Sequence, residues 1–306
     1  MQLRANGPFS LEHTLESGQA FRWRRENGWY WGVVAGIVFK VRETVEGVEF
    51  VSGPVSETEA APVLFSYLRL DDDISAIYRE LRRDARLAEA VDLYPGLRLV
   101  RQEPWECLVS FVISAFSNIP RITKHIEEIS VNFGDPVALG DYRRHSFPSP
   151  AQLVEVGEAQ YRELGLGFRS RYLARLPRTV LDLGFDLNEL RRGSFQAVRA
   201  TLLDLYGVGV KVADCVLTFS LDQLEAFPVD VWVRRAVQEW YFEDVRQTDR
   251  SVRLWAAEHF GPNAGYAQQY LFYQRRLEGR ERRSTRSAAT PQGSRPPRQA
   301  PRSRRR

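Results

Sequence analysis

Residues 202–235 contain a tight Gly-Val-Gly turn, at 207–209, between two stretches of helical periodicity. The apolar residues Val198, Leu202 and Leu205 lead into the turn at the spacing of one helix face. Such a turn folds two helices against each other and leaves backbone N–H groups at the start of the second helix, where an anion such as a phosphate can bind. It can also simply close a helix pair, and on the pattern alone both interpretations stay open.

Lys211 stands in the first turn of the second helix. A cation there opposes the helix macrodipole, so helix formation does not explain it. The same field and partial burial favour the neutral amine that a nucleophile requires. Lysine is also rare in this chain, with three lysines among 43 basic residues. The plainer interpretations are an ion pair with Asp214, three residues on, or a point-charge contact to phosphate.

Asp230 follows Pro228 and precedes a helical run, which is the pattern of an N-cap. A carboxylate held near Lys211 can also stabilise a developing cation or accept a proton. Cys215 lies one turn beyond Lys211 on the same helix face, where it either lines a shared pocket or packs as a small hydrophobe. The residues alone therefore predict a lysine nucleophile and an acidic partner beside a phosphate-binding turn.

The composition excludes several other kinds of site. The two cysteines, Cys107 and Cys215, are too few for a disulfide framework, an iron–sulfur cluster or a structural zinc site. The four histidines lack the spacing of metal ligands, so no metal site is predicted. No segment is apolar enough for a membrane span or a secretory signal, which leads us to expect the cytoplasm or nucleoid.

Strand-like alternation in the first part of the chain, followed by helical spacing, predicts an α+β protein. Residues 1–95 alternate apolar and polar residues around an Asn-Gly turn, which indicates an antiparallel sheet of about five strands followed by helices. Residues 96–279 have helical spacing and no convincing strand, so we expect an all-helical domain. Residues 280–306 hold ten Arg, one Glu and no large apolar residue, and we expect a disordered tail. That tail is either a solubilising extension or a nonspecific polyanion tether.

The segment LYGVGVKVADCVLTFSLDQLEAFPVDV closely resembles the helix-hairpin-helix and Gly/Pro-Asp element of base-excision DNA glycosylases, specifically the 8-oxoguanine DNA glycosylase family. The resemblance extends over residues 8–277 and implies a sheet domain followed by an all-α helix-hairpin-helix glycosylase domain. Four further segments match blocks of that family in the same order: SGQAFRW at 17–23, PWECLVSFVISAFSNIPRIT at 104–123, LGLGFRSRY at 164–172 and GYAQQYLF at 265–272.

For catalysis, the resemblance implies that Lys211 attacks C1′ of the damaged nucleotide, expels the base and forms a Schiff base. Loss of the 3′-phosphate from that intermediate by β-elimination gives lyase activity. Asp230 would stabilise the oxocarbenium-like transition state, because base departure builds positive charge on the sugar that a fixed carboxylate offsets. The base must first be flipped out of the duplex to be reached. Gly207 and Gly209 would bind a DNA phosphate.

Four residues match the damaged-base pocket of the family. Cys215 and Phe272 match the two faces that sandwich the extruded purine. Gln268 matches a reader of its Watson–Crick edge. Gly18 matches the glycine whose carbonyl oxygen accepts the N7–H of 8-oxoguanine, a hydrogen that guanine lacks.

Arg121 and Arg169 match the arginines that read the cytosine left behind, and Phe168 matches an aromatic residue that fills the opened stack. Phe116 departs from the family pattern, because the best-known members carry an asparagine at this place. A phenyl ring can act as a wedge but cannot read hydrogen-bonding edges, so we expect weak discrimination for cytosine opposite the lesion.

Two other residues depart from the family pattern: Trp232 replaces a histidine near the phosphates, and Tyr206 replaces the usual proline of the hairpin.

The resemblance implies a bifunctional DNA glycosylase/AP lyase that excises 8-oxoguanine from duplex DNA in base excision repair. We expect a monomer without a cofactor, located with the genome, in the nucleus if the source is eukaryotic. A structural monovalent cation on backbone carbonyls at the hairpin is left open. Two other functions also stay open: a non-catalytic helix-hairpin-helix DNA-binding protein, and a monofunctional glycosylase for alkylated bases.

Overall fold

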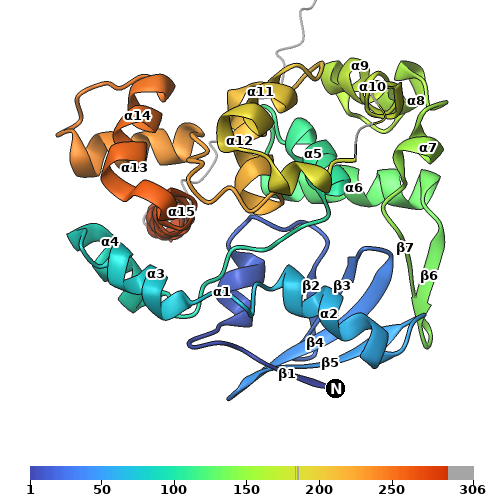
Figure 1. The fold of residues 1–306 in the computed structure, drawn as a ribbon, viewed down its shortest axis with the longest axis horizontal. Helices are drawn as coiled ribbons and strands as arrows, with labels where there is room; N and C mark the ends of the chain where they lie inside the picture. The colour runs from blue at the N-terminus through green and yellow to red at the C-terminus, as the bar shows by residue number, and fades with distance from the viewer. Residues whose placement is uncertain (183, 185, 289–306) are drawn as a thin grey trace, which may run out of the picture.

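The computed structural model describes residues 1–182, 184 and 186–288. A β-sheet forms one end of the molecule and helices from the later part of the chain fill the rest, so the predicted α+β fold is confirmed (Figure 1). In this described part, no helix is both long enough and apolar enough to cross a membrane.

The sheet has five antiparallel strands in the order β1-β5-β4-β3-β2, which confirms the predicted sheet. The first turn has Asn27 and Gly28 at φ of 51° and 78°, both left-handed, as a two-residue hairpin requires. The strands are β1 (Gln2–Arg4), β2 (Arg24–Glu26), β3 (Trp29–Val34), β4 (Ile37–Thr44) and β5 (Gly47–Gly53).

The sheet has its own hydrophobic core, shared with helix α2 (Glu57–Tyr67). Phe39, Val41 and Phe50 of the sheet are fully buried in one cluster with Leu64 of α2. The α2 helix begins with a capping box, in which the Ser56 and Glu59 side chains satisfy backbone N–H groups at the helix start.

The remaining helices follow, and α11 with α12 forms the predicted hairpin. Short 3₁₀ segments are η1 (Gly167–Arg169), η2 (Glu189–Arg192) and η3 (Gly261–Asn263). The α-helices are α1 (Leu11–Glu16), α3 (Ile74–Leu81), α4 (Ala85–Leu93), α5 (Pro104–Ile113), α6 (Ile119–Phe133), α7 (Pro150–Leu153), α8 (Glu158–Glu163), α9 (Ser170–Leu173), α10 (Leu176–Asp182), α11 (Phe195–Leu203), α12 (Val210–Phe219), α13 (Val231–Tyr241), α14 (Asp249–Phe260) and α15 (Ala264–Ala288).

Two local predictions are wrong. The α1 segment was expected to be strand, but Ser10 caps a short helix whose Leu11 and Leu15 are buried in the core of the sheet. The domain expected to be all helical contains a β-hairpin, β6 (Pro136–Leu139) and β7 (Tyr142–His145), and β6 contacts β4 and β5. This hairpin ties the helical region to the sheet.

The helices between residues 57 and 95 divide between the two hydrophobic cores, and the domain boundary at residue 95 stays a prediction. Leu70 belongs to the core of the sheet, whereas Ile74, Leu81 and Leu87 of α3 and α4 are buried in the same cluster as Leu271 of α15. Helices α3 and α4 therefore pack with the helical region.

The predicted tail is also shorter than expected. Helix α15 continues to Ala288, so the prediction of disorder from residue 280 is wrong for 280–288. The rest of that prediction, at 289–306, lies outside the described residues.

Candidate active site

The two glycines of the hairpin differ in what their local structure requires. Gly207 has φ +90°, and a Cβ there would lie 2.5 Å from the Tyr172 ring, so this position excludes a side chain. Gly209 is the N-cap of α12 in extended backbone, and a Cβ on it would meet no atom within 4 Å. The N-terminus of α12 is therefore open to an anion, and phosphate binding at this turn stays a prediction.

The amine of Lys211 is held by two residues of the α5 end. Lys211 Nζ donates a hydrogen bond to Ser114 Oγ at 2.9 Å. The Ser114 hydroxyl donates to the Phe111 carbonyl oxygen at 2.6 Å, which leaves its lone pairs for the amine. Lys211 Nζ also lies 4.8 Å from the centre of the Phe111 ring. The fold thus fixes where this amine lies.

The alternative of an ion pair between Lys211 and Asp214 is wrong. Asp214 is buried and turns to the other side of α12, where Arg199 lies 2.8 Å away and Arg253 3.9 Å away. Lys211 therefore faces its cavity without that carboxylate.

Asp230 caps α13, as predicted, by accepting a hydrogen bond from the Val233 backbone N–H at 2.8 Å. Burial raises the pKa of Asp230, while this backbone donor and the Lys211 charge act in the opposite direction. The carboxylate is therefore fixed by the helix start and lies in the same cavity wall as Lys211.

One cavity of about 320 Å³ brings together the predicted catalytic and base-pocket residues. Burial raises the pKa of the Cys215 thiol to about 12 despite the nearby Lys211, so this thiol stays protonated at neutral pH and acts as an apolar wall. Gln268 Oε1 is buried and makes no hydrogen bond within the described chain. The predicted residues that line the cavity are Gly18, Lys211, Cys215, Asp230, Gln268 and Phe272.

The Gly18 loop is held in place from two sides. The Gln19 side chain bonds the Arg98 carbonyl oxygen at 2.7 Å and the Val100 N–H at 2.9 Å. From α15, Gln269 donates to the Ser17 carbonyl oxygen at 3.3 Å. A Cβ on Gly18, at φ +91°, would lie 2.7 Å from the Ile119 side chain. The cavity wall therefore has room for a glycine backbone here and no more.

The predicted wedge lies on the turn between α5 and α6. Phe116 is 92% exposed at φ 51°, and its ring meets the Phe168 ring edge to face at 6.1 Å. Arg169 is buried beneath them and donates to the Ala115 and Phe116 carbonyl oxygens at 2.7 and 2.9 Å. Of the two arginines that were predicted to read the opposite base, only Arg121 is exposed. Base reading by these arginines stays a prediction.

Three residues of the cavity were missed or left unassigned from sequence. Ser114 gave only a weak signal, a polar residue at the end of the apolar α5 run. Trp232 lines the cavity, and a Cβ on Gly279 would lie 3.3 Å from its ring. Arg276 lines it as well and donates to the Glu16 carbonyl oxygen at 2.8 Å. Helix α15 thus contributes to the cavity beyond Phe272.

Comparison with known proteins agrees with this geometry. A family model described as the N-terminal domain of 8-oxoguanine DNA glycosylase matches residues 3–108, and one described as the HhH-GPD superfamily of base excision DNA repair proteins matches residues 109–261. The chain is 32% identical over 282 residues to the N-glycosylase/DNA lyase OGG1 of Arabidopsis thaliana, covering 86% of this chain and 76% of the relative. This chain belongs to the 8-oxoguanine DNA glycosylase family.

Other members of the family are similar over nearly the same span. An N-glycosylase/DNA lyase of Saccharomyces cerevisiae is 29% identical, over 86% of this chain and 82% of the relative. The 8-oxoguanine glycosylase/lyase of Clostridium acetobutylicum, solved with double-stranded DNA containing cytosine opposite 8-oxoguanine, is 36% identical with a TM-score of 0.83 over 89% of this chain and 93% of that chain. A 3-methyladenine DNA glycosylase from Archaeoglobus fulgidus, at 22% identity and a TM-score of 0.77, shares the fold.

Proposed function

We infer that this chain is a DNA glycosylase and AP lyase that flips 8-oxoguanine out of duplex DNA and excises it through a lysine Schiff base. The observation that carries the inference is that Lys211 Nζ and the Asp230 carboxylate share one cavity with Gly18, Gln268 and Phe272. The names of the relatives, N-glycosylase/DNA lyase and 8-oxoguanine glycosylase/lyase, support the same activity.

The proposed chemistry follows from the Lys211 amine, which reacts in its neutral form, and from the Asp230 carboxylate. The Lys211 amine attacks C1′ as the N-glycosidic bond breaks and the base leaves with the bonding electron pair. Positive charge develops on the sugar in the transition state, and the Asp230 carboxylate, fixed by the start of α13, stabilises it. The nitrogen then loses its proton as the C1′–O4′ bond breaks and O4′ takes up a proton, which leaves an imine at C1′. Loss of the C2′ proton then expels the 3′-phosphate and leaves a double bond between C2′ and C3′.

The pocket residues supply recognition in this proposal. The purine lies between Cys215 and Phe272, whose side chains present apolar surface. The free Oε1 of Gln268 faces a donor on the base edge, and the Gly18 carbonyl oxygen accepts the N7–H of the oxidised base. A buried acceptor without a partner discriminates strongly, because a base that lacks the matching donor leaves it unsatisfied.

Several narrower expectations belong to the same proposal. The substrate is genomic DNA, so we place the protein in the cytoplasm or nucleoid, or in a eukaryotic nucleus. It acts as a monomer. A monovalent cation at the hairpin stays a prediction: the Leu205 and Gly209 carbonyl oxygens each accept one backbone N–H, and a carbonyl oxygen has a second lone pair.

Borohydride trapping on duplexes with 8-oxoguanine opposite each of the four bases tests the function. The wild-type protein should give a covalent adduct, and Lys211→Gln should abolish it while lesion binding is retained. An adduct that persists in Lys211→Gln would show that another residue is the nucleophile. DNA binding without base release would favour a non-catalytic module, and base release without trapping would favour a monofunctional glycosylase.

A further inference from the structure

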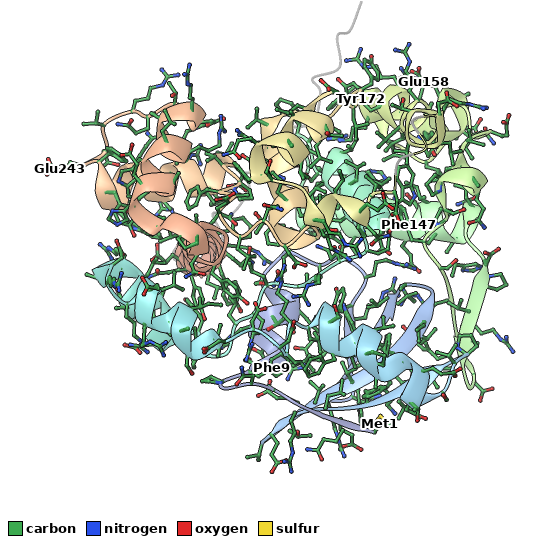
Figure 2. The ribbon with its side chains drawn as sticks, in the orientation of Figure 1. Met1, Phe9, Phe147, Glu158, Tyr172 and Glu243 are labelled. Carbon is green, nitrogen blue, oxygen red and sulfur yellow. The ribbon has the colours of Figure 1, made fainter. Side chains whose placement is uncertain are left out.

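A row of aromatic rings runs from the wedge to the hairpin. Phe116, Phe168, Tyr172 and Tyr206 follow one another at ring-centre distances of 6.1, 6.2 and 5.3 Å, each meeting the next edge to face. They come from the α5–α6 turn, η1, α9 and the α11–α12 turn. Tyr172, a half-buried residue of α9, lies in the upper part of the helical region in Figure 2. We call these four residues the aromatic row.

Arginines flank three of the four rings. The guanidinium carbons of Arg169, Arg171 and Arg175 lie 4.6, 4.9 and 4.6 Å from the centres of the Phe168, Tyr172 and Tyr206 rings.

The hairpin end of the row is the part that is free to bind. Arg171 and Arg175 are exposed, and neither forms an ion pair within the described chain; Arg171 donates one hydrogen bond, to the Tyr172 hydroxyl at 2.9 Å. The side chain of Tyr206 is 40% exposed. Arg169, by contrast, is occupied with the main chain of the wedge.

The row is also continuous with the phosphate-binding turn. The Tyr172 ring fills the space where a Cβ of Gly207 would lie, so the row packs directly on the hairpin. Exposed rings beside cations are the combination that stacks successive bases and attracts their phosphates in proteins that bind single strands. A fully paired duplex offers its phosphates to such a surface but keeps its base faces stacked.

We propose that Tyr206, with Arg171 and Arg175, is a binding surface for unpaired nucleotides of single-stranded DNA. A base stacks on the Tyr206 ring, and the two arginines contact the adjoining phosphates. The inference deepens the proposed function, because the wedge end of the row belongs to the opened duplex in that function, and it extends DNA binding to strands that carry no lesion.

Fluorescence anisotropy with lesion-free oligothymidylate, and with a lesion-free duplex of the same length, tests the proposal. Tyr206→Ala should weaken binding of the single strand about tenfold, because stacking of one base on an aromatic ring is lost. Arg175→Ala should weaken it too. Binding of the duplex should change much less in Tyr206→Ala.

Two variants control the experiment. Tyr206→Phe keeps the ring and should bind the single strand like the wild type. Trp29→Ala removes a ring from the sheet that Arg42 covers at 4.5 Å, the same kind of pair at a distant place, and should leave binding unchanged. Thermal unfolding confirms that each variant is folded.

The possible outcomes distinguish failure of this proposal from failure of the proposed function. Unchanged single-strand binding in Tyr206→Ala, or an equal loss for single strand and duplex, overturns the proposal, since the ring then contributes no stacking. If polyglutamate competes with the single strand, and its binding depends on Tyr206 as strongly as that of the single strand, the proposal is overturned in favour of an acidic peptide. The probes carry no lesion, so failure of 8-oxoguanine excision overturns the proposed function alone, and intact Lys211 trapping with no Tyr206 effect overturns this inference alone.

Discussion

Ser114 holds the amine of Lys211, the proposed nucleophile, by a hydrogen bond. Its hydroxyl accepts from Lys211 Nζ and is itself oriented by the Phe111 carbonyl oxygen. Ser114→Ala should lower the single-turnover rate of base release about tenfold or more, since a small misplacement of a reacting group is costly. The affinity for DNA should stay unchanged, because Ser114 acts on the amine. Single-turnover kinetics and equilibrium binding measure the two effects.

Ser114→Thr is the matched control for that prediction, because it keeps the hydroxyl and should recover most of the rate. A normal single-turnover rate in Ser114→Ala would show that the amine needs no such support. Equal losses of rate and of thermal stability would indicate packing instead of positioning.

Phe116 is the residue that we expect to set the preference for the base opposite the lesion. Its ring is exposed and carries no hydrogen-bonding group, and Arg169 beneath it is committed to main-chain carbonyls. A good bidentate contact to a base is worth about 1–3 kcal/mol of discrimination, so without one the excision rates opposite the four bases should lie within about tenfold of each other. Rates measured with 8-oxoguanine opposite each base check this.

Phe116→Asn is the informative comparison, since it restores a side chain with donor and acceptor groups and should increase the preference for cytosine. A strict requirement for cytosine in the wild-type protein would contradict the prediction. It would mean that the exposed Arg121 reads the base alone.

In the hairpin between α11 and α12, we expect Gly207 to be needed for stability and Gly209 for DNA binding. Gly207→Ala forces a Cβ into the Tyr172 ring at positive φ, so it should cost about 1–3 kcal/mol of stability and several degrees in the thermal midpoint. Gly209→Ser meets no neighbour and places a favoured N-cap at α12, so its stability should be kept. Thermal unfolding measures both variants.

DNA affinity, in contrast to stability, should be lowered by the change at Gly209. The side chain of Gly209→Ser projects from the exposed N-terminus of α12 and should weaken binding of duplex DNA in a folded protein. Unchanged affinity in Gly209→Ser would place the phosphate elsewhere. Unchanged stability in Gly207→Ala would mean that Tyr172 moves freely.

Elements with strong local signals were predicted well. The Asp230 cap and the Asn-Gly turn were recognised because each acts on its own neighbours. The β6–β7 hairpin was missed because its strands have four residues each and are stabilised by contact with β4 and β5. Helix α1 was missed for a similar reason, since it has six residues and depends on the burial of Leu11 and Leu15.

In the candidate site too, features with a local sequence signal were predicted and those set by distant contacts were not. Lys211 and Asp230 were found because a cation at a helix start and a carboxylate at an N-cap are local patterns. The bond from Lys211 to Ser114 joins residues 97 positions apart, and no local pattern predicts it. The burial of Arg169 under the wedge could not be predicted, because sequence gives its type and place but not the direction of its side chain.

On the scale of the whole molecule, Asp222 joins the sheet region to the helix that carries Lys211. It follows α12 and lies 2.6 Å from Arg69, which is buried after α2, and 2.8 Å from Arg101. Breaking a buried ion pair by removing one partner costs about 3–5 kcal/mol, and the partial exposure of Asp222 reduces this. Asp222→Asn should therefore cost about 2–3 kcal/mol.

The pH dependence of the stability lost in Asp222→Asn shows whether the ion pairs cause the loss. Burial alone would raise the pKa of Asp222, but Arg69 and Arg101 outweigh it and hold the pKa below its usual value. A lowered pKa in the folded state contributes stability above the unfolded value, about 3.9, and loses it as the pH falls through the folded value. In urea unfolding, the gap between wild type and Asp222→Asn should be full at pH 7 and at pH 5 and shrink only in stronger acid.

Asp92→Asn is the matched control, because Asp92 pairs with Arg82 at the same 2.6 Å but both side chains are exposed. An exposed pair of this kind is worth about 0–1 kcal/mol, so its loss should scarcely change the unfolding midpoint at any pH. A gap for Asp222→Asn that is already closed at pH 5, or that is no larger than for Asp92→Asn, would mean that the two regions are held together by apolar packing alone. A gap that behaves as expected shows that the carboxylate of Asp222, paired with the buried Arg69 and the half-buried Arg101, helps to keep the helix of Lys211 docked on the sheet.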